Sequence, residues 1–252
     1  MRYIRKDWAS QGRILILISV FLSLSITLSG CLYPEDKEGR TKVNYRESVR
    51  RIQSAVDDYQ KEEGLLPIIN AETTTPRYEK FRVDLNLLNQ KGYLDDIPAT
   101  AFEKGGSAYF LILNEESSPT VKVMDLATVQ KVNDVQLQVT RYMSAHGGAL
   151  PSGEEIYPGL YLLDTKKAGI GSVELTSVYS GQVLPFLMDI EGKVYVDYVF
   201  DIMAVINKNG GGHEQNKDLR LALEQASYFV PVKSLPYLWI NEQPVPQAPN
   251  GQ

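Results

Sequence analysis

The chain has 252 residues, of which 43% are hydrophobic and 23% are charged, and its formal net charge at pH 7 is −5. This length allows one large domain or two small ones with an ample core. The acidic excess argues against binding of nucleic acid or of an anionic lipid surface by the folded part, and we expect it to serve solubility.

Residues 1–30 contain the three parts of an export signal, namely a basic head, an apolar run and a small-residue cleavage site. The run ends in residues that resemble a bacterial lipobox: Leu28, Ser29 and Gly30, followed by Cys31. This resemblance implies cleavage before Cys31 and a diacylglycerol on its thiol. Acyl chains such as palmitate contribute about 0.8 kcal/mol per buried methylene, and two or more hold a protein stably on a membrane. We therefore predict a lipoprotein anchored to the outer face of the cell membrane.

The alternative for this segment is an uncleaved transmembrane helix, but its apolar run of about 15 residues is shorter than the roughly 20 that span a bilayer. Cys31 is the only cysteine, which excludes an internal disulfide. Acylation explains this cysteine better than a buried free thiol, because the residues after it are mostly polar. Removal of residues 1–30 leaves 22 basic and 30 acidic residues, a net charge of −8.

Residues 31–44 are polar and lack an apolar period, so we expect a tether between the membrane and the folded part. A helix is predicted over residues 45–63, because apolar residues recur there at steps of three, four and three. These residues are Val49, Ile52, Val56 and Tyr59. Gly64 suits the C-terminal cap, and Pro67 cannot continue the helix.

The next part of the chain predicts a loop and then a hairpin. Residues 68–82 indicate a loop, residues 83–89 a short strand or a helical turn, and residues 92–98 a crossing rich in turns. The apolar stretch 108–113 and the alternating stretch 121–126 predict two strands paired as a hairpin.

The same order of features then starts again, 83 residues further along the chain. The corresponding residues are Val132, Val135, Val139 and Tyr142 in the helix, Gln136 for Gln53, Gly147 for Gly64, Pro151 for Pro67 and Asp164 for Asp84. A second hairpin follows, with strands at 183–188 and 194–198. We infer an internal duplication; the alternative is coincidence, since amphipathic helices share this spacing.

These patterns predict an α+β fold of two tandem helix-on-antiparallel-sheet units, residues 45–127 and 128–208. A glycine link and a C-terminal extension make up residues 209–252. A helix is favoured over residues 198–208, with a long strand as the alternative. The elements expected in the extension are a helix at 219–226, edge strands at 228–232 and 237–240, and a frayed end over the last ten residues.

We find no catalytic set, metal site or cofactor site in the sequence. The two histidines, His146 and His213, have no partners at metal-ligand spacing. There is no Gly-x-Ser-x-Gly elbow, although a sequence does not exclude a triad assembled in space. Cys31 is lost as a nucleophile if it is acylated, and Gly105 and Gly106 lack the spacing of a phosphate-binding loop.

Carboxylates occur as adjacent pairs, which we interpret as solvated faces because neighbours on a helix diverge by about 100°. The pairs are Asp57-Asp58, Glu62-Glu63, Asp95-Asp96 and Glu115-Glu116. Asp84 and Asp164 occupy matching places in the two units, and we expect each to cap the turn that follows it.

Two resemblances add to this pattern. The Gly-x-x-Pro helix exit, the segment Lys91–Pro98 and a Gly-Gly-x-x-Tyr strand are similar to the globular half of type II secretion pseudopilins, over residues 45–113 and more faintly 128–198. This likeness implies a fold only, because a lipobox stands in place of the prepilin-peptidase site. The lipobox, Cys31–Glu35 and Phe229–Tyr237 together resemble the YphF-type lipoproteins of Bacillus relatives, which implies a Gram-positive envelope and no catalytic residue.

We therefore expect a non-enzymatic interaction or scaffold module with a protein partner in the envelope, bound in a groove between the two units. A small-ligand receptor is the main alternative, and a deep pocket lined by tyrosines and Trp239 would favour it. A cell-wall hydrolase would need a carboxylate pair or a histidine of shifted pKa in a cleft.

Overall fold

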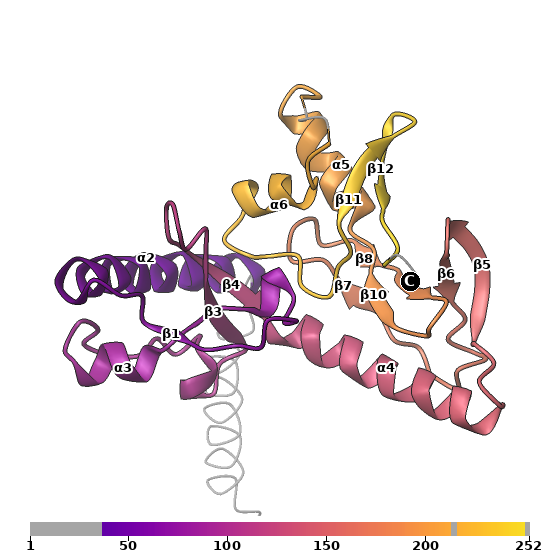
Figure 1. Cartoon of the computed structure of the whole chain (residues 1–252), viewed down its shortest axis with the longest axis horizontal. Helices are drawn as coiled ribbons and strands as arrows, with labels where there is room; N and C mark the ends of the chain where they lie inside the picture. The colour runs from indigo at the N-terminus through magenta and orange to yellow at the C-terminus, as the bar shows by residue number, and fades with distance from the viewer. Residues whose placement is uncertain (1–36, 213–215, 250–252) are drawn as a thin grey trace, which may run out of the picture. The chain divides into compact units, whose positions relative to one another are not determined.

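The computed structural model describes residues 37–212 and 216–249, with helices and strands labelled as in Figure 1. The predicted lipobox, Leu28 to Cys31, and His213 lie outside these residues. From Val43 onward the chain forms one compact unit. None of the helices within the described ranges combines the length and the apolar character that crossing a bilayer requires.

Helix α2 (Lys37–Glu63) buries the predicted apolar face and ends where the sequence indicates. Its buried side chains include Tyr45, Val49, Ile52, Val56 and Tyr59. Gly64 has a φ of +71° and donates its N–H to the Gln60 carbonyl, so it terminates the helix as expected. The described part of the helix already includes Lys37, inside the predicted tether, because Lys, Glu and Arg favour helix without any apolar period.

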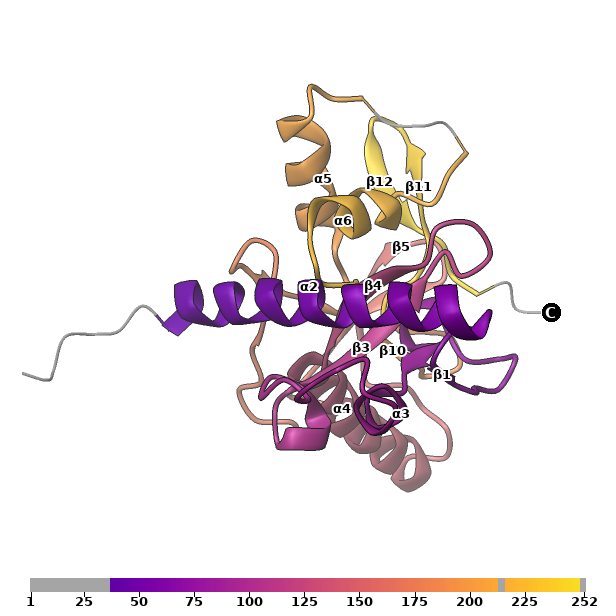
Figure 2. The same cartoon turned by 90° about the vertical axis from the view of Figure 1, so that its left-hand side faces the viewer.

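The first sheet is a four-stranded antiparallel sheet in chain order, and α2 lies across one of its faces (Figure 2). Its strands are β1 (Ile68–Ile69), β2 (Arg82–Val83), β3 (Ala108–Leu113) and β4 (Thr120–Asp125). The connections carry η1 (Arg77–Glu79), α3 (Leu85–Gln90) and η2 (Phe102–Lys104). The β3–β4 hairpin is confirmed. The predicted loop at 68–82 in fact contains β1 and η1, since two-residue strands leave no alternation to detect.

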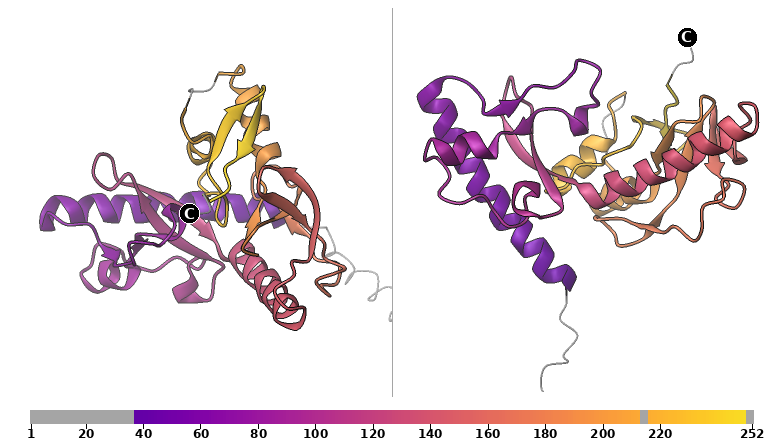
Figure 3. Two further views of the ribbon diagram at one scale, coloured as in Figure 1. Left: turned by 45° about the vertical axis from the view of Figure 1, so that its right-hand side comes forward. Right: turned by 90° about the horizontal axis from the view of Figure 1, so that it is seen from below.

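The second long helix, α4 (Leu126–Ala145), follows β4 without a loop, and the Asp125 side chain caps it by accepting the Thr128 N–H. It packs against a second antiparallel sheet (Figure 3). The strands of that sheet, in order, are β5 (Ser152–Tyr157), β6 (Leu160–Leu163), β9 (Phe186–Asp189) and β10 (Val194–Val196). The β5–β6 hairpin was not predicted, because Ser, Gly and Glu dominate the start of β5.

The strand predicted over 183–188 is broken in the structure. Its first part, β8 (Val183–Leu184), pairs with β7 (Leu175–Thr176) in a separate ribbon, while β9 joins the main sheet. Pro185 stands at the break, and proline cannot donate the N–H that a continuous central strand needs.

The C-terminal part adds two helices and a hairpin. They are α5 (Val199–Lys208), α6 (Arg220–Ala226), β11 (Tyr237–Ile240) and β12 (Gln243–Pro246). Both helices and β11 are as predicted. The expected fraying of the last ten residues is wrong for β12, which pairs with β11 and buries Val245.

Residues 228–233, here called the C-terminal strap, touch both main sheets. Val123 of β4 donates its N–H to the Tyr228 carbonyl and accepts the N–H of Val230. Val196 of β10 donates its N–H to the Lys233 carbonyl. The strap has only one isolated bridge, so it is not the regular strand predicted at 228–232. It joins the two sheets along their last strands.

Candidate functional site: a groove beside the edge of the first sheet

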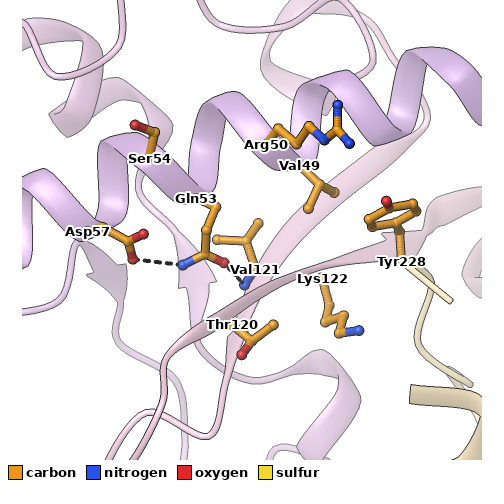
Figure 4. A pocket seen from close by; sticks show the side chains of 9 residues that line it. All are labelled: Val49, Arg50, Gln53, Ser54, Asp57, Thr120, Val121, Lys122 and Tyr228. Carbon is orange, nitrogen blue, oxygen red and sulfur yellow. Dashed lines mark hydrogen bonds between the residues drawn. The ribbon is translucent and has the colours of Figure 1, made fainter. Parts of the chain in front are cut away.

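One glutamine joins α2 to the edge of β4. The Gln53 Oε1 accepts the Val121 N–H at 2.7 Å, and its Nε2 donates to the Pro119 carbonyl at 3.1 Å. The same Nε2 donates to Asp57 Oδ1 at 2.8 Å, as Figure 4 shows. The side-chain amide thus pairs with the Val121 N–H and the Pro119 carbonyl, two of the backbone groups that a neighbouring strand could bind.

Gln136 of α4 makes the matching contact in the second sheet. Its Oε1 accepts the Val194 N–H at 2.8 Å, and its Nε2 donates to the Gly192 carbonyl at 2.9 Å. Val194 begins the last strand of its sheet, and Val121 is the second residue of β4. We call the two contacts the glutamine clamps.

Beside the first clamp lies a groove with a volume of about 380 Å³. Helix α2 forms one side, the edge of β4 forms the other, and Tyr228 of the strap closes an end (Figure 4). The lining residues are Val49, Arg50, Gln53, Ser54, Asp57, Thr120, Val121, Lys122 and Tyr228.

The two cations of the groove differ in their surroundings. Lys122 donates from Nζ to the carbonyls of Glu224 and Ser227, at 2.6 and 2.9 Å. Burial lowers the pKa of Lys122, partly offset by the nearby Glu224 carboxylate. Arg50 is exposed and has no hydrogen bond or ion pair with another described residue. Arg50 is therefore the cation available to a ligand.

Next to Lys122, a group of charged side chains ties the first region to α6 and the strap. Glu224 is 5% exposed, and its carboxylate lies 3.2 Å from the Arg77 guanidinium and accepts the Tyr78 hydroxyl at 3.3 Å. Lys233 pairs with Glu79 at 2.9 Å. These groups satisfy one another, so their evident role is to hold the C-terminal part in place.

Carboxylates with shifted pKa values lie in the second region and do not line the groove. Asp197 accepts the hydroxyls of Tyr157 and Tyr237, and burial raises its pKa against these hydrogen bonds. Asp201 accepts the Ser177 hydroxyl at 2.7 Å, and burial likewise raises its pKa. They are 3% and 1% exposed, respectively, which keeps substrates away from them.

Of the paired carboxylates, only Asp57 lines the groove. The predicted caps are confirmed: Asp84 accepts the Leu87 N–H, and Asp164 accepts the N–H groups of Lys166 and Lys167. Within residues 37–212 and 216–249, no group of His, Cys, Asp and Glu is placed to hold a metal ion.

Two further residues lie elsewhere than in the groove. His146 ends α4, with Nδ1 2.8 Å from the Tyr142 carbonyl and its ring stacked on that tyrosine. Trp239 packs against the core of the second region, so the tyrosine and tryptophan pocket that would favour a receptor is not this groove.

The sequence patterns did not single out Arg50 or Tyr228 as site residues. Arg50 has the pattern of an ordinary exposed charge on an amphipathic helix. Tyr228 lies beside the groove only because the strap packs against β4. The matching glutamines were the available signal, because a polar residue repeated beside two apolar helix faces indicates a shared contact.

Part of the chain matches a known protein family. Residues 45–125 match the model of the YphF family N-terminal domain. The matched range begins in α2 and ends at Asp125, the N-cap of α4, so it contains the first sheet and its clamp. The first region is therefore YphF-like. Neither a curated protein nor a solved structure matches the chain significantly.

Proposed function

We propose that this protein is a lipid-anchored, extracytoplasmic interaction module of a bacterial cell envelope, non-enzymatic, with the groove as its contact site for a protein partner. The observation that carries the proposal is the groove beside α2. Helix α2 is the helix that follows the predicted anchor, Cys31, along the chain. The lipobox-like segment and the YphF-like first region support the envelope location.

We also infer that the two helix-and-sheet regions are tandem, pseudopilin-like units produced by duplication. The glutamine clamps support this, because Gln53 and Gln136 are 83 residues apart and bind the last strand of each sheet in the same way. The segments that follow α2 and α4 also make matching backbone hydrogen bonds. Asp84 donates its N–H to the Pro67 carbonyl, and Asp164 donates to that of Pro151.

A small-ligand receptor is a second candidate, favoured by the groove volume of about 380 Å³, because ligand pockets span about 300–1,000 Å³. A cell-wall hydrolase has less support. The carboxylates of raised pKa are buried outside the groove, and Asp57, the carboxylate that lines it, is held by Gln53.

The anchor is tested with Cys31→Ala. We expect the parent to incorporate labelled palmitate and to sediment with membranes, and the variant to lose both properties. An unlabelled parent, or a variant that stays labelled, contradicts the lipoprotein assignment.

The contact site is tested by photo-crosslinking in living cells with Cys31 intact. A photoreactive residue replaces Ser54, which lines the groove, or Ser144, an exposed serine on α4, as the matched control. We expect a discrete protein adduct at position 54 and not at position 144. Equal labelling at both positions, or none at position 54, contradicts the proposal and directs attention to small ligands.

A further inference from the structure

Resting on the proposed function, we propose that the groove takes an extended peptide segment of the partner, which adds to the edge of β4 and carries an acidic side chain toward Arg50. The proposal follows from the backbone groups of the β4 edge, the position of the strap and the charges on α2.

The edge of β4 is already used for strand addition by the chain itself. Val123 exchanges two backbone hydrogen bonds with the strap, one to Tyr228 and one from Val230. In an antiparallel ladder, residues two apart point their backbone groups to the same side. The N–H and the carbonyl of Val121 therefore also point away from β3, into the groove.

Gln53 occupies only one of these two groups. Its Oε1 accepts the Val121 N–H, and its Nε2 donates to the Pro119 carbonyl and to Asp57. Within residues 37–212 and 216–249 no group donates a hydrogen bond to the Val121 carbonyl, which faces the groove next to the point where the strap leaves the edge. An extended peptide that donates an N–H there would continue the line of the strap.

The charges on α2 select the chemistry of that peptide. Arg46 and Arg50 are exposed, lie one helical turn apart and have no ion pair among the described residues. They stand out on a chain whose predicted mature net charge is −8. A carboxylate can take a charge-assisted hydrogen bond from Arg50, whereas a basic peptide would be repelled.

The walls suit a strand with alternating side chains. Val49 and Tyr228 give the groove an aliphatic and an aromatic lining residue, while the ammonium of Lys122, which also lines it, is held by backbone carbonyls. Side chains of a bound strand point alternately to opposite sides, so one set can pack here and the other remain in solvent.

The test uses the full-length lipidated protein in lipid nanodiscs and a phage-displayed library of short random peptides. We expect enriched peptides with β-forming residues around an acidic residue, bound by the parent and by Ser144→Trp but not by Ser54→Trp. Replacing the acidic residue of an enriched peptide by lysine, or methylating its backbone nitrogens, should abolish binding.

The charge is tested with Arg50→Glu against Arg141→Glu, an equal charge change on the exposed face of α4. We expect the affinity for an enriched acidic peptide to fall about tenfold or more in the first variant, as loss of a charge-assisted hydrogen bond implies, and to stay unchanged in the second. Equal affinity in both variants, or enrichment that survives Ser54→Trp, overturns the proposal.

The two experiments separate failure of the peptide-binding proposal from failure of the proposed function. If the library yields no peptide dependent on Ser54 while the cellular crosslink at position 54 persists, the peptide mode is wrong and the interaction module stands. Loss of the cellular crosslink removes the proposed function itself.

Discussion

The two helix-and-sheet regions use the same clamp but surround it differently. In the first region, Gln53 is accompanied on α2 by Arg50 and Ser54. The positions 83 residues later, beside Gln136, hold Asn133 and Leu137. The helix-to-sheet contact therefore depends on one glutamine, while its neighbours determine whether the surface can take a charged ligand.

The regions also differ in what they bury. The second region buries three carboxylates, those of Asp189, Asp197 and Asp201, whereas the buried polar residue between positions 44 and 125 is Ser48. Between positions 44 and 125 the buried side chains are thus almost all apolar, whereas the second region also buries a network of carboxylates. This difference predicts how each region responds to substitution and to pH.

The largest effect is expected from a charge placed on either buried helix face. Val56 and Val139 are both 0% exposed, and Val56→Asp or Val139→Asp should cost about 4 kcal/mol or more, enough to abolish cooperative thermal unfolding. The matched controls are Ser54→Asp and Leu137→Asp, on the exposed faces, with expected changes within about 0.5 kcal/mol. A Val139→Asp protein that melts like the parent would contradict the similarity of the two helices.

A smaller effect, specific to the second region, is expected for Tyr237→Phe. The Tyr237 hydroxyl donates to Asp197 at 2.9 Å and accepts the Tyr198 N–H at 2.8 Å. Its removal leaves the buried Tyr198 N–H unpaired and takes one hydrogen bond from Asp197, and it should cost about 2 kcal/mol, measured by urea unfolding. Tyr45→Phe, in the first region, removes a single contact with Ser107 and should cost about 1 kcal/mol or less. Equal losses would refute the contrast between apolar and polar packing.

The clamps should respond alike. Gln53→Ala and Gln136→Ala each remove one bond from a strand N–H and one to a carbonyl, and each should cost about 1–2 kcal/mol. Gln53→Ala also removes the bond to Asp57, which is exposed and adds little. Gln130→Ala, on the exposed face of α4, should change stability by less than about 0.5 kcal/mol. A clear difference between the two clamp variants in urea unfolding would weaken the case for equivalent units.

The smallest effect is expected in the pH dependence. Burial raises the pKa of Asp201, so the folded state holds this proton more tightly than the unfolded state. Stability should therefore gain from Asp201 as the pH falls from neutral through the raised pKa toward the ordinary carboxyl value. Asp201→Asn should show less of this gain than the parent when urea unfolding is compared at several pH values. Parallel profiles would mean that Asp201 does not titrate in this range.

Much of the fold follows from local patterns. The buried faces of α2 and α4 were predictable because their apolar residues recur with the helical period of 3.6. Gly64 and Pro67 mark the end of α2. The β3–β4 hairpin and the capping roles of Asp84 and Asp164 were equally local. The YphF resemblance could also be stated from the sequence and is supported over residues 45–125.

The tertiary structure decided how these elements meet. The groove depends on Tyr228, more than 100 residues from Val121, and the placement of Lys122 depends on carbonyls of Glu224 and Ser227. Contacts over such separations leave no period or spacing in the sequence, because the strap satisfies the sheet edges through backbone groups that every residue possesses. The sequence by itself determined the buried helix faces, the end of α2, the β3–β4 hairpin and the two matching glutamines, because each depends on local spacing. Tertiary packing determined the short strands, the break at Pro185 and which backbone groups of the β4 edge face the groove.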